Sequence, residues 1–399
     1  MNLSEVNMAH GGDRYRNTIH LDFSVNLNPL NTPDFLLAAM QEGIREVGFY
    51  PDPEQEAAKK AAAGFYSEMS GLVINPLWVI PGNGASELIS AVVHAICPRE
   101  VLIPAPCFTG YLHACHSERK EGSIDSPAGG DGVPLSFMGT EGHSGSDRVV
   151  FYRTKEEKGF SPDDGLGMLI GPKTELLILT NPGNPAGRLI DPALLRRILQ
   201  ITRERKIPVL LDECFMEFTG RTAESGLNLL SEYPNLMVLR AFTKIFSMPG
   251  LRLGILFTSD QVLQRKISVA LPEWNLSCFA EAVLIAAAEE RTVLQEYIKD
   301  TVQKTGRLRE MMAGRLSELG VNVYPSDANF LLTKGLSEYR EGLLKEGILT
   351  RSCGDMWPLT DEYIRLSVRP GAEQEVLFTS LKRMMQEKER KTLWISRPN

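Results

Sequence analysis

The chain has 399 residues, 43% of them hydrophobic and 23% charged, which predicts a packed protein of two or three domains and excludes the fibrous and disordered classes. Its formal net charge of −7 argues against nucleic-acid binding, and no apolar run is long enough to span a bilayer. Six scattered cysteines without a C-x-x-C pair, and a polar start without a signal-peptide core, predict reduced thiols in a cytoplasmic protein.

Short apolar runs alternate with helical patterns along much of the chain, after an extended arm that runs through Leu30. The predicted helices begin near Phe35, at Pro53, after the loop 82–86, after Pro106 and at Pro192. The predicted strands are residues 77–80, 101–103, 176–180, 208–211, 236–239 and 254–257. Strands that alternate with helices predict a mainly parallel sheet covered on both faces.

The chain divides into three predicted parts. Residues 1–48 form an N-terminal arm and part of a small domain, residues 49–271 form a large domain, and residues 272–399 form the C-terminal small domain. Within the large domain, the glycine-rich residues 121–147 predict a surface excursion. The last part has a long helical pattern and candidate strands at 321–324, 329–332, 348–350 and 364–368. We therefore expect an α/β fold with a large, mostly parallel sheet and a smaller α+β domain.

Polar side chains follow three of the predicted strands. Asn184 lies in a turn rich in proline and glycine, Asp212 directly follows an apolar run, and Lys244 follows the next run. Ligands of an open parallel sheet bind beyond the carboxyl ends of its strands, so these three residues should share one site. A lysine amine can form a Schiff base with an aldehyde, and an aspartate can pair with a protonated pyridine nitrogen.

Two further features suit a phosphate group. The loop 82–87 opens a helix, where backbone N–H groups and the helix dipole favour an anion. Arg252 follows Lys244 by eight residues and can bind a phosphate through bidentate hydrogen bonds. Together with the residues at the strand ends, these features predict a site for a phosphorylated aldehyde.

The order of these motifs resembles that of the fold-type I pyridoxal-phosphate enzymes. The motifs are G-N-G-A-S-E at 82–87, N-P-G-N-P-A-G at 181–187, D-E-C-F at 212–215 and T-K-x-x-x-x-P-G-L-R-x-G at 243–254. The resemblance implies pyridoxal 5′-phosphate as the cofactor. It also implies that Lys244 bonds the cofactor covalently, that Asp212 pairs with its pyridine nitrogen, and that Asn184 bonds its phenolic oxygen.

The resemblance further implies how the rest of the cofactor is held. Tyr50 would reach the cofactor phosphate of a neighbouring subunit, which implies a homodimer. Phe215 stands where many aminotransferases have a tyrosine, so the phenolic oxygen would lack one donor. The remaining implied contacts are an aromatic ring over the pyridine, from Phe108, and the phosphate-binding residues Asn83, Gly84, Ser86, Thr243 and Arg252.

The arm and the C-terminal arginines resemble those of the threonine-phosphate decarboxylases of cobalamin synthesis. The segments concerned are H-G-G at 10–12, D-F-S-V-N-L-N-P at 22–29, R-S-C at 351–353 and Y-I-R at 363–365. Histidinol-phosphate aminotransferases share the D-F-x-x-N-x-N-P arm. The resemblance implies that Arg365 faces the substrate carboxylate and that Arg351 and His10 face its phosphate. The other implied substrate residues are Gly11, Asn26 and Asn184.

The expected reaction is the decarboxylation of O-phospho-L-threonine, or a close phospho-amino acid such as O-phosphoserine, to an aminoalcohol phosphate. One alternative is an aminotransferase acting on histidinol phosphate or a related amino acid. An alternative of another class is a non-catalytic effector-binding module, although the motifs begin by Asp22 and leave no room for a helix-turn-helix domain. We expect no metal, because His113 and His116 lie on a predicted helix without a carboxylate partner.

Overall fold

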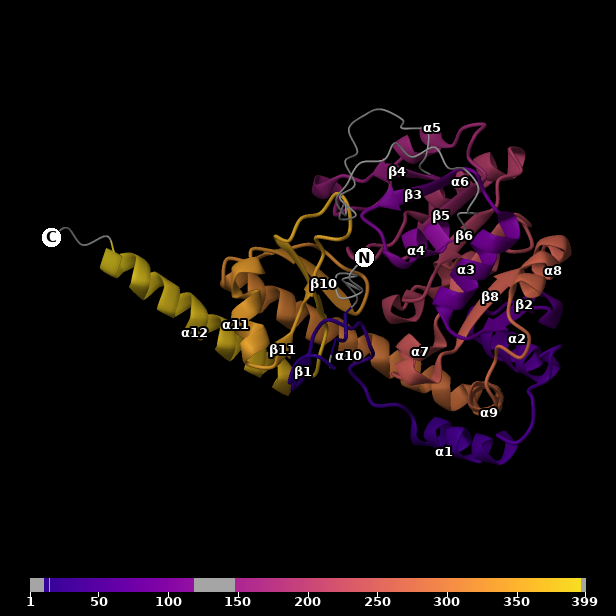
Figure 1. The fold of residues 1–399 in the computed structure, drawn as a ribbon, viewed down its shortest axis with the longest axis horizontal. Coiled ribbons are helices and arrows are strands. Elements are labelled where there is room, and N and C mark those ends of the chain that lie inside the picture. Colours follow the sequence, from indigo (N-terminus) through magenta and orange to yellow (C-terminus); the bar gives the residue numbers. More distant parts are fainter. Residues whose placement is uncertain (1–10, 14, 118–147, 396–399) are drawn as a thin grey trace, which may run out of the picture.

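The computed structural model describes residues 11–13, 15–117 and 148–395, so the predicted excursion at 121–147 lies outside the described residues. The chain forms a larger and a smaller lobe, and the C-terminal helix α12 (Gly371–Ile395) projects from the smaller lobe (Figure 1). Within the described ranges, no helix is both long enough and apolar enough to cross a membrane.

The larger lobe is built on a sheet whose seven described strands have the order β2-β8-β7-β6-β5-β3-β4. In this sheet β8 runs antiparallel to both of its neighbours, and the other pairs are parallel. The predicted α/β fold with a mostly parallel sheet is therefore confirmed. The strands are β2 (Val79–Gly82), β3 (Val101–Ala105), β4 (Val149–Arg153), β5 (Leu176–Thr180), β6 (Val209–Asp212), β7 (Leu236–Arg240) and β8 (Gly254–Thr258).

These strands form where short apolar runs are shielded from water. Every residue of β6, β7 and β8 is buried, which explains why their sequences do not alternate between polar and apolar residues. Helix α6 (Pro192–Glu204) begins where it was predicted, because the side chain of Asp191 accepts a hydrogen bond from Leu194 N at 2.9 Å. The other helices after these strands are α3 (Ala85–Ile96), α4 (Gly110–Ser117), α5 (Gly165–Leu169), α7 (Phe242–Ile245) and α8 (Gln261–Ala270).

The smaller lobe combines both ends of the chain. Its antiparallel sheet has the order β12-β13-β10-β9, and a separate strand from the arm, β1 (Leu21–Asp22), pairs in parallel with β11 (Ile348–Leu349). Phe23 of the arm is fully buried in a core formed with β10, β13 and three helices. The elements are β9 (Asn322–Val323), β10 (Phe330–Lys334), β12 (Arg351–Ser352), β13 (Tyr363–Ser367), α10 (Arg291–Glu318), α11 (Arg340–Lys345) and α12.

Three further helices pack together beside the large sheet. They are α1 (Asp34–Glu42), α2 (Glu56–Ser70) and α9 (Cys278–Glu289), and α9 contacts both of the others. Buried residues of all three, such as Leu36, Phe65 and Val283, belong to the hydrophobic core of the large sheet. The domain limits near residues 48 and 271 stay predictions.

Two predicted starts were wrong for local reasons. The strand β2 begins at Val79 rather than residue 77, because Asn75 Oδ1 accepts a hydrogen bond from Leu77 N at 3.0 Å and stabilises a 3-10 turn. Helix α2 begins at Glu56 rather than at Pro53, because the Asp52 carboxylate accepts hydrogen bonds from two following backbone N–H groups and forms a turn there. Strand β4 was not predicted.

Candidate active site

The carboxyl ends of β5, β6 and β7 bring the three predicted polar residues to one edge of the sheet. These strands are neighbours, and Asp212 is the register partner of Thr180 on one side and of Leu239 on the other. Asn184 lies in the turn after β5, and Lys244 lies in the one-turn helix α7 after β7. The topology therefore gathers residues that are far apart in the sequence, as the motifs predicted.

Lys244 has the environment of a reactive amine. Desolvation lowers the pKa of Lys244, and the nearby charges of Arg365 and Arg252 lower it further, while Cys214 and Asp212 act in the opposite direction. A lowered pKa increases the neutral fraction of the amine at physiological pH. The neutral form is the nucleophile that attacks an aldehyde.

Asp212 is buried and held at both carboxylate oxygens. Its Oδ2 accepts a hydrogen bond from Tyr111 Oη at 2.6 Å, and its Oδ1 accepts one from Cys214 N at 3.0 Å. Burial and the Asp212 charge raise the pKa of Tyr111, so its hydroxyl stays a donor. Tyr111 also lies 2.9 Å from Thr180 Oγ1. Sequence reasoning missed Tyr111, although it lies three residues after Phe108.

The start of α3 forms a cradle with Arg252. Gly84 has a φ of +88°, and a Cβ added there would lie 2.6 Å from Arg252 Nη2, so the loop backbone and the guanidinium are close together. Thr243 is buried in α7, beside Lys244, while Asn83 is exposed on the loop and Ser86 is exposed in the first turn of α3. Backbone N–H groups at a helix start and a neighbouring guanidinium suit a phosphate group.

Arg365 links the smaller lobe to the strand ends of the larger one. Its Nη1 donates to Asn184 Oδ1 at 2.6 Å, and its Nη2 donates to Ser24 O at 2.8 Å. Burial lowers the pKa of Arg365 to about 10, so the guanidinium remains charged at neutral pH. An arginine held in this way beside Lys244 can orient an anionic group of a ligand.

The N-terminal arm lies directly over Ser24. Gly12 N donates to Ser24 Oγ at 2.7 Å, and a Cβ on Gly11 would lie 2.5 Å from Ser24 O. Glycine at position 11 therefore permits the close approach of the arm to the carbonyl that Arg365 binds. His10 lies outside the described residues.

Arg351 and Asn26 complete the described part of the predicted substrate region. Arg351 is the cross-strand partner of Arg365, and its Nη2 lies 2.7 Å from Asp355 Oδ2. Asn26 is only 3% exposed, and its buried Oδ1 has no hydrogen-bond partner within the described residues. Buried polar atoms of native proteins are almost always satisfied, so this oxygen is available to a bound ligand.

Asn28 fixes the position of Lys244 and was missed by sequence reasoning, although it lies in the quoted arm motif. Its backbone N–H donates to Lys244 O at 3.3 Å, and its side-chain Nδ2 donates to Ile245 O at 2.7 Å. The same Nδ2 lies 3.0 Å from Thr301 Oγ1 of α10. The arm, the Lys244 helix and α10 are therefore joined at one buried amide.

Phe108 and Tyr50, two predicted cofactor contacts, differ in how far they are buried. Phe108 is partly buried, and its ring lies edge-on to Tyr111 with 5.6 Å between the centroids. Tyr50 is 80% exposed, with its ring 4.7 Å from that of Trp274. Tyr50 is thus on the surface of this chain and is not enclosed with Asp212.

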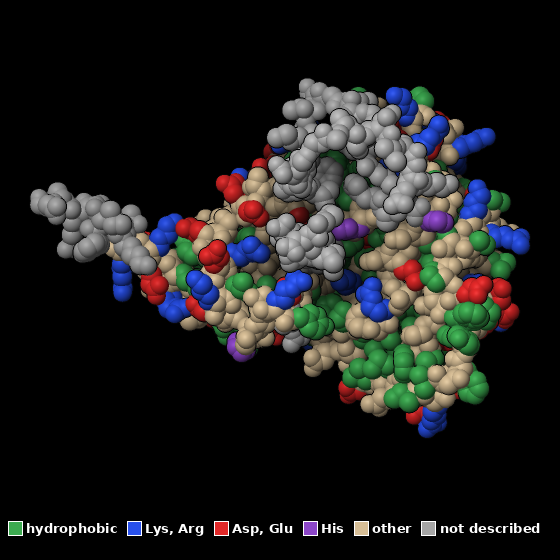
Figure 2. Space-filling model, viewed as in Figure 1, with side chains coloured by type: hydrophobic (Ala, Val, Ile, Leu, Met, Phe, Trp, Pro, Cys, Tyr) green, Lys and Arg blue, Asp and Glu red, His purple; other side chains and the backbone are tan. Residues whose placement is uncertain are grey.

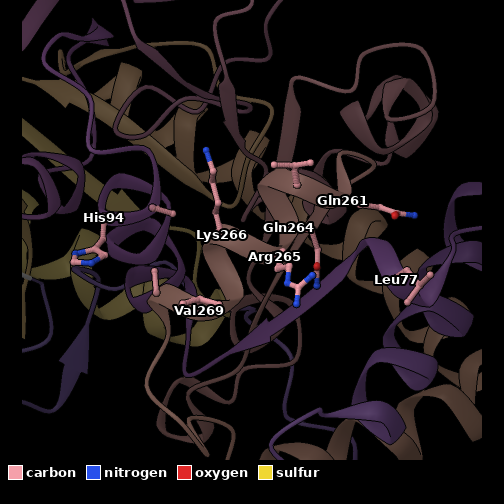
Figure 3. A pocket seen from close by; sticks show the side chains of 10 residues that line it. Leu77, His94, Gln261, Gln264, Arg265, Lys266 and Val269 are labelled. Carbon is pink, nitrogen blue, oxygen red and sulfur yellow. The ribbon is translucent and has the colours of Figure 1, made fainter.

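One groove on the surface lies away from the strand ends. It has a volume of about 830 Å³, and Figure 3 shows side chains of α3 and α8, such as His94 and Lys266, around it. Its lining includes none of the predicted site residues. The charged and polar side chains that can hold a cofactor gather instead around Lys244.

The chain matches known proteins over most of its length. Residues 18–121 and 142–383 match the family described as aminotransferase class I and II. Threonine-phosphate decarboxylase of Salmonella typhimurium is 28% identical over 95% of this chain and 97% of its own, and histidinol-phosphate aminotransferase of Thermococcus gammatolerans is 30% identical over 82% and 81%. The solved structure of histidinol-phosphate aminotransferase from Clostridium acetobutylicum is 26% identical, with a TM-score of 0.77 over 92% of this chain and 99% of that one. This chain therefore belongs to the class I and II aminotransferase family of pyridoxal-phosphate-dependent enzymes and has their fold-type I architecture.

Proposed function

We propose that this enzyme decarboxylates O-phospho-L-threonine, or a close phospho-amino acid such as O-phosphoserine, to an aminoalcohol phosphate for cobalamin biosynthesis. The observation that carries the proposal is the pair of buried cations Arg351 and Arg365, which are 8% and 6% exposed and lie opposite each other on adjacent strands. Such a pair suits a short substrate with an anionic group at each end. The similarity to threonine-phosphate decarboxylase supports the same substrate class.

In this proposal the two arginines divide the anionic groups of the substrate. Arg365 binds the α-carboxylate, because its bond to Asn184 holds it beside the cofactor residues. Arg351 binds the phosphate, with His10 of the arm as its partner. Asn26 offers its unpartnered Oδ1 to the substrate amine. Gly11 lets the arm approach this region closely.

The residues around Lys244 fit pyridoxal phosphate. Lys244 would supply the amine that bonds the cofactor aldehyde, Asp212 would accept a hydrogen bond from the pyridinium nitrogen, and the cradle at Gly84 and Arg252 would hold the phosphate. Asn184 would donate through its Nδ2 to the phenolic oxygen, because its Oδ1 already accepts from Arg365. When bound, the cofactor draws electron density from the substrate carbon whose bond breaks.

The proposed reaction replaces the substrate carboxylate with a proton. The bond between the α-carbon and the carboxylate breaks, carbon dioxide leaves, and one proton replaces it on the same carbon. Lys244 Nζ is the proposed proton donor, because it is the amine of the site and desolvation lowers its pKa from the usual range of lysine. Arg365 orients the carboxylate so that this bond, and not the Cα–H bond, is the one that breaks.

A second candidate is an aminotransferase acting on histidinol phosphate. It is favoured by the similarity to the Clostridium acetobutylicum structure, with its TM-score of 0.77. It would use the same lysine and aspartate to break the Cα–H bond. Phe215 argues for the decarboxylase: its ring packs 5.1 Å from that of Phe330, and it has no hydroxyl to offer the cofactor. A non-catalytic effector-binding module is the remaining alternative.

We further propose a cytoplasmic homodimer in which Tyr50 reaches the cofactor phosphate of the partner. Figure 2 shows hydrophobic side chains gathered over the region of α1 and α9. The exposed apolar residues near Tyr50 in the chain are Ile44, Val47 and Phe49, and the ring of the half-exposed Trp274 lies 4.7 Å from that of Tyr50. A second copy would cover this surface. All six cysteines are free thiols, which supports a reducing compartment.

One incubation separates the candidates. The holoenzyme is supplied in parallel with O-phospho-L-threonine, O-phosphoserine, and histidinol phosphate plus 2-oxoglutarate, while carbon dioxide and oxo products are measured. The proposal expects carbon dioxide from a phospho-amino acid. Efficient conversion of histidinol phosphate, with no carbon dioxide from either phospho-amino acid, would establish the aminotransferase instead. No product from any substrate would favour the non-catalytic module.

A further inference from the structure

Two like charges face each other in the proposed substrate region. Arg351 and Arg365 are register partners in the antiparallel pair β12–β13, and both are more than nine-tenths buried. Like charges directly opposite each other destabilise a sheet, and buried charges need compensation. The two arginines differ in how they are compensated.

Within the described residues Arg365 has only neutral hydrogen-bond acceptors. These are Asn184 Oδ1 and Ser24 O, and its buried Nε has no partner. Asp355 and Asp22 are near enough to raise the pKa of Arg365 by their charge, but neither hydrogen-bonds it. The guanidinium is therefore ready to receive an anionic group of a ligand.

Arg351 already forms an ion pair with Asp355. Its Nη2 lies 2.7 Å from Asp355 Oδ2, a distance typical of a charge-assisted hydrogen bond. The loop holds Asp355 in place, because Ser352 Oγ accepts from Gly354 N at 3.2 Å and donates to Asp361 Oδ1 at 2.5 Å.

Only one of the two carboxylate oxygens of Asp355 contacts Arg351. Its second oxygen, Oδ1, is buried without a hydrogen-bond partner within the described residues, and its side chain remains 28% exposed. A carboxylate at the border of solvent can leave Arg351 at a lower cost than a fully enclosed one. The pair Arg351–Asp355 is thus an ion pair that a stronger anion can open.

We propose that Asp355 is a built-in competitor for the anion site at Arg351, and that it limits the affinity for the phosphate of both substrate and product. This rests on the proposed function, in which Arg351 binds that phosphate. Before substrate binds, Asp355 neutralises Arg351. After carbon dioxide leaves, the product keeps its phosphate but has lost the carboxylate that Arg365 held. The ion pair between Asp355 and Arg351 then forms again, which favours release of the product.

The test compares two variants in which a carboxylate is replaced by the uncharged amide of the same length. Asp355→Asn keeps an oxygen for Arg351 but removes the charge, and Glu362→Gln removes one charge from the same lobe at a side chain that is 64% exposed and 3.5 Å from Lys334. Each holoenzyme is titrated by calorimetry with inorganic phosphate and with O-phospho-L-threonine. Asp355→Asn should bind both about fivefold tighter or more, the effect of one charge at roughly 4 Å even under water-like screening. Glu362→Gln should stay within about twofold of the wild type.

Unchanged or weaker phosphate binding by Asp355→Asn would overturn the proposal and leave Asp355 as a residue that only orients Arg351. Asp355→Ala is the second neutral variant should the first fail to fold, and it carries the same expectation. Inorganic phosphate is not a substrate, so its titration judges Asp355 alone. Absence of decarboxylation by the wild type would reject the proposed function without deciding this question.

Discussion

Replacing Gly84 by alanine should weaken cofactor binding, because it disturbs the cradle at the start of α3. The φ of +88° at Gly84 is a conformation that glycine adopts at little cost. A Cβ there would lie 2.6 Å from Arg252 Nη2, far inside van der Waals contact. Either the loop must change its conformation or the guanidinium must move away.

The size of the effect follows from these two options. Gly84 has a φ of 88° and a ψ of 164°, a conformation that essentially only glycine adopts, and holding another residue there costs about 1–3 kcal/mol. Moving a guanidinium away from a partly buried anion that it binds costs about 2–5 kcal/mol. A loss of about 2 kcal/mol in binding free energy corresponds to a dissociation constant for pyridoxal phosphate that is roughly thirtyfold higher.

The assay is a titration of apoenzyme with pyridoxal phosphate, followed by absorbance. Gly64→Ala is the matched control, because Gly64 lies in α2 and a Cβ there meets no atom within 4 Å. That variant should bind the cofactor as the wild type does. If Gly84→Ala bound it as tightly as Gly64→Ala, the assignment of the cradle to the cofactor phosphate would be wrong.

Three further predictions concern the same site. Tyr111→Phe removes the 2.6 Å hydrogen bond to Asp212, so the free energy of unfolding of the apoenzyme should fall by about 1.5–3 kcal/mol, and an unchanged urea midpoint would contradict the role of Tyr111. Desolvation lowers the pKa of Lys244, so its amine is neutral, and able to react with an aldehyde, over a wider pH range. Borohydride reduction of the holoenzyme should therefore attach the cofactor at Lys244. Peptide mapping that found the cofactor on another lysine would refute this. If the proposed dimer forms, mixing Lys244→Ala and Tyr50→Phe chains should restore activity, because one site of each hybrid dimer is free of both changes. A mixture no more active than its parents would argue against a role of Tyr50 across the interface.

The large sheet and its three strand-end residues could be predicted because both depend on local patterns. Short apolar runs bounded by turns mark the strands, and parallel strands place their carboxyl ends at one edge. Strand 176–180 and the start of α6 matched the prediction for this reason. The starts of β2 and α2 depended on single side-chain hydrogen bonds, from Asn75 and Asp52, that periodicity does not register.

Contacts between distant segments could not be predicted in the same way. Tyr111 meets Asp212 across a sequence separation of 101 residues, and Asn28 meets the Lys244 helix across more than 200. The residue type does not predict either contact, because tyrosine and asparagine are common on helices and in turns. The pairing of Arg351 with Asp355 is local in sequence. Its proposed role in limiting anion binding depends on Arg365, which faces Arg351 across the sheet.

The central claim, decarboxylation rather than transamination, is tested most directly by turnover without an oxo acid. The holoenzyme is given a large excess of O-phospho-L-threonine or O-phosphoserine, and carbon dioxide is counted per active site while the cofactor absorbance is followed. A decarboxylase returns a proton to the carbon that lost the carboxylate, so we predict many equivalents of carbon dioxide and a cofactor that stays in its aldehyde-derived form. Conversion of the cofactor to its amine form after one equivalent, with no carbon dioxide, would contradict the account.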